Sequence, residues 1–248
     1  MVSFTRFALA LVCGLPLMAG SFSFSDFSST AGLNLVGSAT NPSNTIQLTP
    51  AGAMQAGAVW DTTLWNVLGG FTTTFNYSVS GGTSPEADGI AFVIQDDPSG
   101  TTALGNNGGL LGAGAMHNSV TVALRTYGYN DAEVDSCGAG NTQQIGGCLV
   151  GSSAAETLTG THTVQINYVP GTLTVFLDSS QILSDSINLG TAINLNSGNL
   201  AYVGLTAGTG SNNSAQTINS WSFATVPEPA TWSLMGLALP LLFLRRRS

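Results

Sequence analysis

Residues 71–79 read FTTTFNYSV, and the alternation in this segment predicts the fold class. Phe71, Phe75, Tyr77 and Val79 are large and apolar, whereas the other residues of the segment are Thr, Asn or Ser. A period of two places successive side chains on opposite faces of an extended chain, which is the pattern of a β-strand and not of a helix. We therefore expect a strand here, with one face in a core.

The same period of two continues on both sides of this segment. Residues 120–125 alternate in the same way, and residues 164–168 and 173–177 flank Pro170-Gly171, a pair suited to a hairpin turn. Further strands are expected at residues 45–48, 90–95, 201–206 and 218–224. About a dozen strands without an internal repeat predict an all-β domain, a two-sheet antiparallel jelly-roll sandwich.

The charge of the chain restricts its partners. The formal net charge is −8 over 248 residues, and the five basic residues are all arginines. Four of them lie in the terminal segments, so Arg125 is the one fixed positive charge of the central domain, residues 21–225. Nucleic acids and anionic membrane surfaces bind through a basic face, so neither is an expected partner.

The first 20 residues are expected to be a secretory signal peptide. Arg6 precedes an apolar stretch from Phe7 to Leu17, and the small residues Ala19 and Gly20 follow it. This order of a basic residue, an apolar stretch and small residues is typical of a segment that is removed during export. Cleavage is expected near Ala19 or Gly20.

Residues 226–248 form a separate segment after the domain. Pro227-Glu228-Pro229 opens it, an apolar run covers residues 230–244, and arginines occupy residues 245–247. Two closely spaced prolines cannot lie inside a helix, so they mark the end of the folded domain. The apolar run is near the lower limit of the roughly 17–25 residues that cross a bilayer as a helix, and terminal arginines stay on the cytoplasmic side.

This tail resembles the PEP-CTERM sorting signal of Gram-negative bacteria that make exopolysaccharide. The resemblance implies a C-terminal apolar helix that anchors the chain transiently in the inner membrane, and an exosortase-type enzyme that cuts at Pro227-Glu228-Pro229. The mature protein would then lie at the cell surface or in the extracellular matrix. A plain C-terminal membrane anchor is the alternative interpretation.

Two cysteines remain once the signal peptide is removed, Cys137 and Cys148. Exported proteins fold in an oxidising compartment, and a metal site would need further soft ligands, which this segment lacks. We expect a disulfide that closes a short loop and contributes about 2–3 kcal/mol by the chain-entropy account.

A second resemblance extends over most of the central domain. Residues 87–95 read ADGIAFVIQ, a glycine-rich segment follows at 104–112, and NSVTV stands at 118–122. Towards the C-terminal end the chain reads VGLTA at 203–207 and NSWSF at 219–223. In this order the segments resemble legume-type (L-type) lectins, which implies a concanavalin A-like jelly roll that binds carbohydrate.

The lectin resemblance also implies which residues contact a sugar. In L-type lectins the Asp of Ala-Asp-Gly follows a cis peptide and accepts hydrogen bonds from two sugar hydroxyls, and this role falls on Asp88. A backbone N–H of Gly108 or Gly109 and the amide of Asn130 would donate, and the loop 208–213 would supply selectivity. The implied carbohydrate-binding residues are Asp88, Gly108, Gly109, Asn130, Ser211 and Asn212. The alternative for Asp88 is an ordinary carboxylate at a surface turn.

The chain departs from the lectin pattern where that family holds its metals. The family's Glu-x-Asp motif, which binds a transition metal and calcium, is replaced by Ala123 and Arg125. Hard cations need clustered oxygen ligands, so the usual metal pair is not expected. We expect Arg125 to stand in for the calcium charge and to pair with Asp88 or Asp135.

The acidic run at residues 131–135 leaves two further interpretations open. Asp131, Glu133 and Asp135 alternate, and they would be the ligands of a single weakly held Ca²⁺, the one cofactor that the sequence allows. More often such a run is a solvated loop.

A glycoside hydrolase is the main competing class, because such enzymes share the jelly roll and act with two carboxylates. Glu133 and Asp135 form half of a Glu-x-Asp-x-x-Glu pattern, but Cys137 and Gly138 stand where the second Glu is needed, and the segment is loop-like. We therefore expect no enzyme. The expected function is binding of a polysaccharide or other glycan by an exported protein, and a structural matrix protein with a decayed lectin site is the second alternative.

Overall fold

The structure, a computed structural model, describes residues 20–195 and 199–226, which belong to one compact unit. The signal peptide expected at residues 1–20 and the sorting tail expected at residues 226–248 lie outside this part of the chain, apart from Gly20 and Val226. Within the described ranges, no helix is long and apolar enough to cross a membrane.

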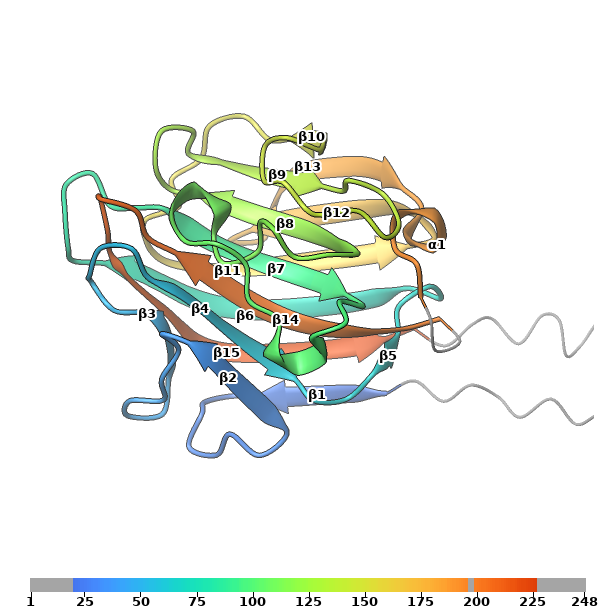
Figure 1. Cartoon of the computed structure of the whole chain (residues 1–248), viewed down its shortest axis with the longest axis horizontal. Coiled ribbons are helices and arrows are strands. Elements are labelled where there is room, and N and C mark those ends of the chain that lie inside the picture. Colours follow the sequence, from blue (N-terminus) through green and yellow to red (C-terminus); the bar gives the residue numbers. More distant parts are fainter. Residues whose placement is uncertain (1–19, 196–198, 227–248) are drawn as a thin grey trace, which may run out of the picture. The chain divides into compact units, whose positions relative to one another are not determined.

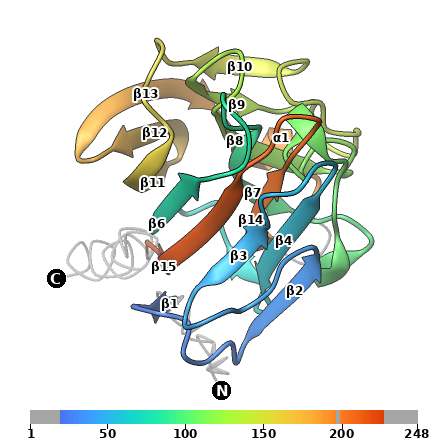
Figure 2. The ribbon, with the colours of Figure 1, turned by 90° about the vertical axis from the view of Figure 1, so that its left-hand side faces the viewer.

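Two antiparallel sheets lie face to face and confirm the predicted all-β sandwich (Figure 1, Figure 2). The sheet that we call the back sheet consists, in spatial order, of β1 (Ser21–Phe24), β15 (Ala215–Thr225), β6 (Phe71–Ser80), β11 (Gly160–Val169), β12 (Gly171–Leu177) and β13 (Ser180–Ile187), with β3 (Ile46–Thr49) also paired to β15. The front sheet consists of β10 (Leu149–Ser152), β9 (Asp131–Asp135), β8 (Ser119–Arg125), β7 (Gly89–Gln95), β14 (Leu200–Gly208), β4 (Ala56–Asp61) and β2 (Leu33–Gly37), with β5 (Trp65–Asn66) paired to β14.

The core between the sheets contains the apolar faces that the alternation predicted. In β6 the side chains of Phe71, Phe75, Tyr77 and Val79 are buried, and they alternate with partly exposed polar residues except at the buried Thr73. Burying a large apolar side chain contributes about 1.5–3 kcal/mol, so this face stabilises the strand in its place. The predicted hairpin is also present, because β11 and β12 pair continuously along the same sheet.

The central strands of the front sheet are buried on both faces, which the alternation did not indicate. Every residue of β7 is buried, because residues 96–118 fold over the outer face of the sheet and form a second, smaller core there. This segment includes the 3-10 helices η1 (Gly100–Thr102) and η2 (Gly108–Leu110). The indole N–H of Trp60 in β4 donates to the carbonyl of Ala103 at 2.9 Å and ties the segment to the sheet. The second core consists of Ala58, Trp60, Ala91, Val93, Ala103, Leu111, Ala113, Met116 and Ala123.

Two elements differ from the sequence prediction. Residues 131–135, interpreted as loop-like, form strand β9, in which Glu133 and Asp135 are buried. A short helix, α1 (Leu189–Ala192), interrupts a domain for which no helix was predicted. Strand β9 forms because β8 and β10 lie on its two sides and supply backbone hydrogen-bond partners, which satisfy the polar groups of this buried segment.

Candidate functional site

A pocket of about 430 Å³ lies where β7 begins, and it contains Asp88. Its wall combines two carboxylates, one guanidinium, two phenol rings and several apolar side chains. The residues that line it are Asp88, Gly109, Leu111, Arg125, Tyr127, Tyr129, Glu133, Ile145, Gly146 and Leu149.

The backbone of Asp88 is held on both sides. Its N–H donates to the carbonyl of Gly208 at 3.0 Å, and its own carbonyl accepts from the N–H of Thr126 at 2.9 Å. The peptide between Ala87 and Asp88 is cis, as the lectin resemblance implies. Burial raises the pKa of Asp88 above its usual value, and the backbone N–H of Gly210 lowers this pKa by a smaller amount. Atom Oδ2 is buried and accepts no hydrogen bond from the described part of the chain.

Two glycine-containing loops meet at this carboxylate. Gly109 lines the pocket and its N–H donates to no described residue, whereas the N–H of Gly108 is bonded to the carbonyl of Thr209 at 3.0 Å. Of the two glycines considered from the sequence, Gly109 therefore has the free donor. Gly210 lies so close that a Cβ on it would be 3.2 Å from Asp88 Oδ2, so a side chain there would crowd the carboxylate.

The other residues assigned from the sequence do not line the pocket. Ser211 and Asn212 lie in the loop between β14 and β15, where the amide of Asn212 donates to the carbonyl of Pro85 at 3.2 Å. Asn130 lies in the turn between β8 and β9 with a φ of 56°, and it is exposed. The structure therefore brings together only part of the predicted set.

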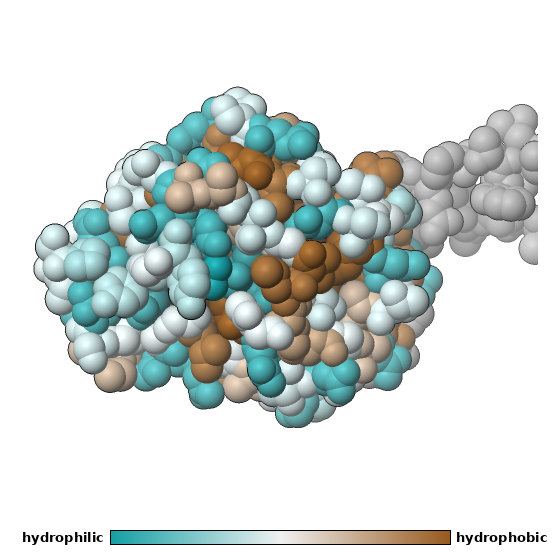
Figure 3. Space-filling model, turned by 90° about the horizontal axis from the view of Figure 1, so that it is seen from above, coloured by the Kyte–Doolittle hydropathy of each residue, from teal (hydrophilic) through white to brown (hydrophobic). Residues whose placement is uncertain are grey.

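Aromatic and apolar side chains at the rim were missed by the sequence reasoning. Tyr127, Tyr129 and Leu149 line the pocket and are 41%, 64% and 51% exposed. Exposed apolar side chains that gather in one place mark interaction sites. Figure 3 views the molecule from the side of β9 and β10 and shows apolar surface near the middle of that face. The available signal was a pair of closely spaced tyrosines directly after the strand at residues 119–125.

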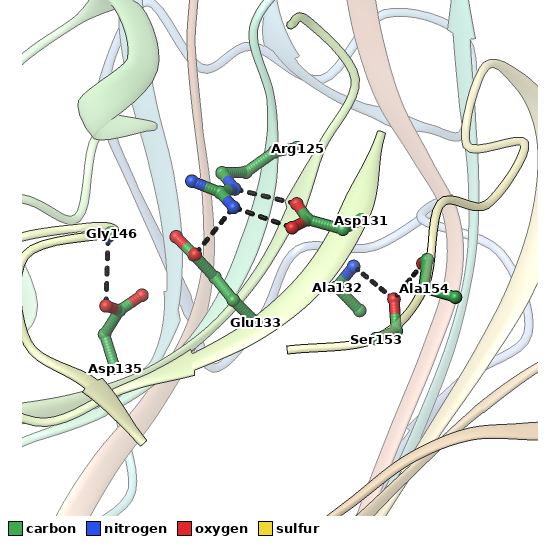
Figure 4. Close-up of polar contacts among 8 residues, drawn as sticks. All are labelled: Arg125, Asp131, Ala132, Glu133, Asp135, Gly146, Ser153 and Ala154. Atoms are coloured by element: carbon green, nitrogen blue, oxygen red, sulfur yellow. Dashed lines mark hydrogen bonds and ion pairs between the residues drawn. The ribbon is translucent and has the colours of Figure 1, made fainter. Parts of the chain in front are cut away.

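Arg125 is bound by two carboxylates of β9, and Figure 4 shows its guanidinium pointing between them. Its Nε and Nη2 donate to the two carboxylate oxygens of Asp131 at 2.8 and 2.7 Å. Nη2 also lies 2.9 Å from Oε2 of Glu133. The guanidinium is thus shared between two acidic side chains of one neighbouring strand.

The partners expected from the sequence, Asp88 and Asp135, form no ion pair with Arg125, and that prediction was wrong. Strand register explains the difference. Arg125 lies directly opposite Asp131, and Glu133 follows two residues along the same strand. Side chains opposite each other on neighbouring strands are about 5 Å apart at Cβ, so Asp131 is nearest to the guanidinium and Glu133 is next. Asp135 lies opposite Thr121, two residues further along β9 than Glu133.

This arrangement does not fit the metal pair of L-type lectins. Ala123, where that family has a carboxylate, lies opposite Glu133, and Arg125 places N–H donors where a cation requires oxygen ligands. Within residues 20–195 and 199–226, no group of three or more His, Cys, Asp or Glu side chains is placed to hold a metal. The Ca²⁺ site considered at Asp131, Glu133 and Asp135 is therefore not supported, because the guanidinium binds the first two.

Glu133 and Asp135 are also not the solvated loop residues that the sequence suggested, because both are fully buried in β9. Burial, reinforced by the neighbouring carboxyl, raises the pKa of Glu133 to about 8, and burial raises that of Asp135 to about 6. Arg125 opposes both shifts through its positive charge.

We expect the domain to lose stability as the pH rises from about 4.5 to about 8. Folded Glu133 keeps its proton up to a pKa of about 8, whereas the unfolded chain loses this proton near 4.5. The folded state binds more protons in this window, so the free energy of unfolding falls with rising pH. Thermal melts at stepped pH measure the slope. Glu133→Gln should flatten it because Gln does not titrate, and an unchanged slope would contradict the assignment.

A disulfide closes the loop that forms one wall of the pocket. Cys137 and Cys148 are bonded, as predicted, and the loop between them carries Ile145 and Gly146. The N–H of Gly146 donates to Oδ1 of Asp135 at 3.0 Å (Figure 4). The loop therefore lies over the buried carboxylates and holds this wall in place.

Comparison with known proteins identifies the family. Solved structures with the same fold include the winged bean acidic lectin complexed with methyl-α-D-galactose, with a TM-score of 0.71, 21% identity and coverage of 86% of this chain and 100% of that chain. A lectin from Bauhinia forficata in complex with GalNAc has a TM-score of 0.68 and 20% identity, and covers 86% of this chain and 100% of its own. Arcelin-5, a lectin-like defence protein from Phaseolus vulgaris, has a TM-score of 0.70 and 21% identity, with coverage of 84% and 99%.

A family profile agrees with the structural likeness, whereas individual curated sequences do not add to it. No curated protein matches the chain in sequence. The family profile described as the legume lectin domain matches residues 19–235, which is most of the chain. The chain belongs to the legume lectin domain family.

Proposed function

We propose that this chain is an exported carbohydrate-binding protein that binds a glycan in the pocket at Asp88. The observation that carries the proposal is the buried Oδ2 of Asp88, which has no described partner, in one pocket with the free N–H of Gly109. Neighbouring sugar hydroxyls both donate and accept, so they match an acceptor and a donor in the same pocket. A buried polar atom without a partner costs about 1–3 kcal/mol, which a bound hydroxyl would offset.

The rim supports the same function by providing an apolar platform. The ring centroid of Tyr129 lies 3.7 Å from Cζ of Arg125, so the guanidinium covers one face of the ring while the side chain stays 64% exposed. An aromatic ring combines a large apolar surface with a defined orientation, which suits the C–H face of a pyranose. The two plant lectins compared above hold methyl-α-D-galactose and GalNAc, which supports a pyranose as the ligand.

The family also supports binding without catalysis, because legume lectins are non-enzymatic carbohydrate-binding proteins. The second carboxylate of the pocket, Glu133, lies 2.9 Å from the guanidinium of Arg125. A hydrolase would need both carboxylates free to act on opposite sides of a glycosidic bond.

Asp88→Asn is expected to lower the affinity for glycans at least tenfold, because a charged acceptor becomes a neutral amide that also places an N–H in the pocket. A glycan array of the wild-type protein identifies the ligand, and titration with that glycan compares the variants. Asp26→Asn is the matched control, because Asp26 is an exposed carboxylate in the loop between β1 and β2. Undiminished binding by Asp88→Asn would show that another group carries the site. A wild-type protein that binds no glycan would instead be the structural matrix protein.

We further propose that the protein reaches the cell surface or exopolysaccharide matrix of a Gram-negative bacterium. The support is in the sequence: the signal-like residues 1–20, the Pro227-Glu228-Pro229 tail and a disulfide typical of oxidising compartments. In this proposal the tail anchors the chain transiently in the inner membrane until an exosortase-type enzyme removes it.

The mature protein in its native host is expected to lack the arginines at residues 245–247. We expect cleavage because the apolar run is too short and too interrupted for a stable anchor. Cleavage at the tail motif removes all residues after it. Intact-mass measurement of protein from the cell surface and medium checks this. Full-length C-termini on released protein would overturn the processing step and leave the glycan proposal unaffected.

A further inference from the structure

The pocket carries an excess of negative charge. Its titratable carboxylates are Asp88 and Glu133, and its guanidinium, Arg125, is bonded to a third carboxylate, Asp131. Three carboxylates against one guanidinium leave a net charge of −2, and protonation of Glu133 still leaves −1. Arg125 is the one Lys or Arg of the described part of the chain, so no second cation offsets this excess.

The pocket also contains buried acceptor atoms that no donor of the described residues reaches. Oδ2 of Asp88 and Oε1 of Glu133 are both buried, and neither accepts a hydrogen bond from the described residues. The Nε and Nη2 donors of Arg125 are directed at the β9 carboxylates, and the ring of Tyr129 covers a face of its guanidinium. A ligand that brings donors and positive charge into this pocket therefore complements these acceptors.

We propose that the pocket selects a hexosamine with a free amino group over the corresponding neutral hexose, and that it rejects the corresponding hexuronic acid. This inference rests on the proposed glycan-binding function and specifies its ligand class. An ammonium group brings three N–H donors and one positive charge to Asp88, and charge-assisted hydrogen bonds are about twice as strong as neutral ones.

The alternatives fit less well on the same grounds. A neutral hexose supplies hydroxyl donors without charge, so it binds through Asp88 and Gly109 but leaves the excess negative charge in place. A hexuronic acid adds a carboxylate to a pocket that is already negative, and the guanidinium of Arg125 is already shared by two acidic partners. Like charges brought together in a partly desolvated site repel each other.

The test is a titration of the wild-type protein with three sets of monosaccharides, each comprising the hexose, hexosamine and hexuronic acid of the gluco, galacto or manno series. Heat of binding or NMR shifts give the dissociation constants, at about pH 6.5, where the sugar amine is protonated. Within the series that binds, the hexosamine should bind about fivefold to tenfold more tightly than the hexose, and the hexuronic acid more weakly than either. Raising the salt concentration to about 1 M should reduce the preference, because it shortens the screening length to about 3 Å.

Glu133→Gln tests the contribution of the second carboxylate. A positive charge bound at Asp88 favours the ionised form of Glu133, whereas Gln cannot ionise, so this variant should lower the ratio of hexosamine to hexose affinity. Asp26→Asn, which removes an exposed carboxylate in the loop between β1 and β2, should leave that ratio unchanged. The salt series on the wild-type protein tests the same charge dependence without any substitution, so it decides the matter if Glu133→Gln does not fold.

The outcomes separate this inference from the function on which it rests. Equal affinity for hexose and hexosamine, a preference that high salt does not reduce, or tighter binding of the hexuronic acid overturns the selectivity and leaves glycan binding intact. Absence of binding to every sugar in the three sets overturns the proposed glycan pocket and this inference with it.

Discussion

Arg125→Ala is expected to destabilise the domain by about 3–5 kcal/mol at pH 8 and above, since removing one partner of a buried ion pair leaves uncompensated charge. Asp131 would lose both of its guanidinium hydrogen bonds, and Glu133 would lose its ion pair with Arg125. Tyr129 would lose the group on which it stacks. Chemical unfolding followed by tryptophan fluorescence measures the change.

Arg125→Lys and the pH dependence of Arg125→Ala distinguish the electrostatic contribution of Arg125 to stability from its packing contribution. Arg125→Lys keeps the charge but cannot form the two parallel hydrogen bonds to Asp131, so an intermediate loss is expected. The effect of Arg125→Ala should be smaller near pH 5 than near pH 8, because Glu133 is protonated at the lower pH in the folded state. A loss that does not depend on pH would argue against a charge interaction with Glu133.

The same geometry predicts how the fold responds to metal removal. Because the guanidinium of Arg125 binds Asp131 and Glu133, EDTA should change neither the melting temperature nor glycan affinity, and added Ca²⁺ should have no effect. A fold that melts earlier in EDTA would show that the guanidinium does not replace the family's metals.

Gly89→Ala is expected to cost about 3 kcal/mol or more and to weaken glycan binding strongly. Gly89 follows Asp88 and lies opposite Arg125 in the pair of β7 and β8, with a φ of 144°. A Cβ at this position would be 2.1 Å from the carbonyl oxygen of Leu124. The two strands would have to separate at the pocket, which adds overpacking of about 1–3 kcal/mol to a backbone conformation that costs a similar amount.

Gly32→Ala is the matched control for the backbone term. Gly32 also has a positive φ, 86°, but a Cβ there would meet nothing within 4 Å. It should therefore cost only the conformational part, roughly 1–3 kcal/mol, and leave glycan binding unchanged. Equal losses from Gly32→Ala and Gly89→Ala would show that the contact with Leu124 is relieved at little cost.

The strands followed from the sequence because the direction of a side chain along an extended backbone is local. The alternation in residues 71–79 placed Phe71 and Tyr77 on one face without reference to any other part of the chain. The pairing of Cys137 with Cys148 was equally accessible, because no other cysteine lies in the central domain. The position of the candidate site at Asp88 was implied by the resemblance of the motif order to L-type lectins.

Burial of β7 on both faces was decided by packing. The apolar run of β7 is compatible with any buried strand, and its outer face is covered only because residues 96–118 fold back over it. That segment reaches the sheet through contacts such as Trp60 with Ala103, which are far apart in sequence. Local propensity contains no information about such contacts.

The partners of Arg125 were likewise decided by tertiary structure. The sequence alone determined that the domain has a single fixed positive charge, standing where the lectin family has a metal-binding carboxylate. Which carboxylates bind it depends on the register between β8 and β9, which places Asp131 directly opposite and buries Glu133 beside it. Register is set by which side chains fill the core on both strands at once, so it becomes known only when the two strands are paired.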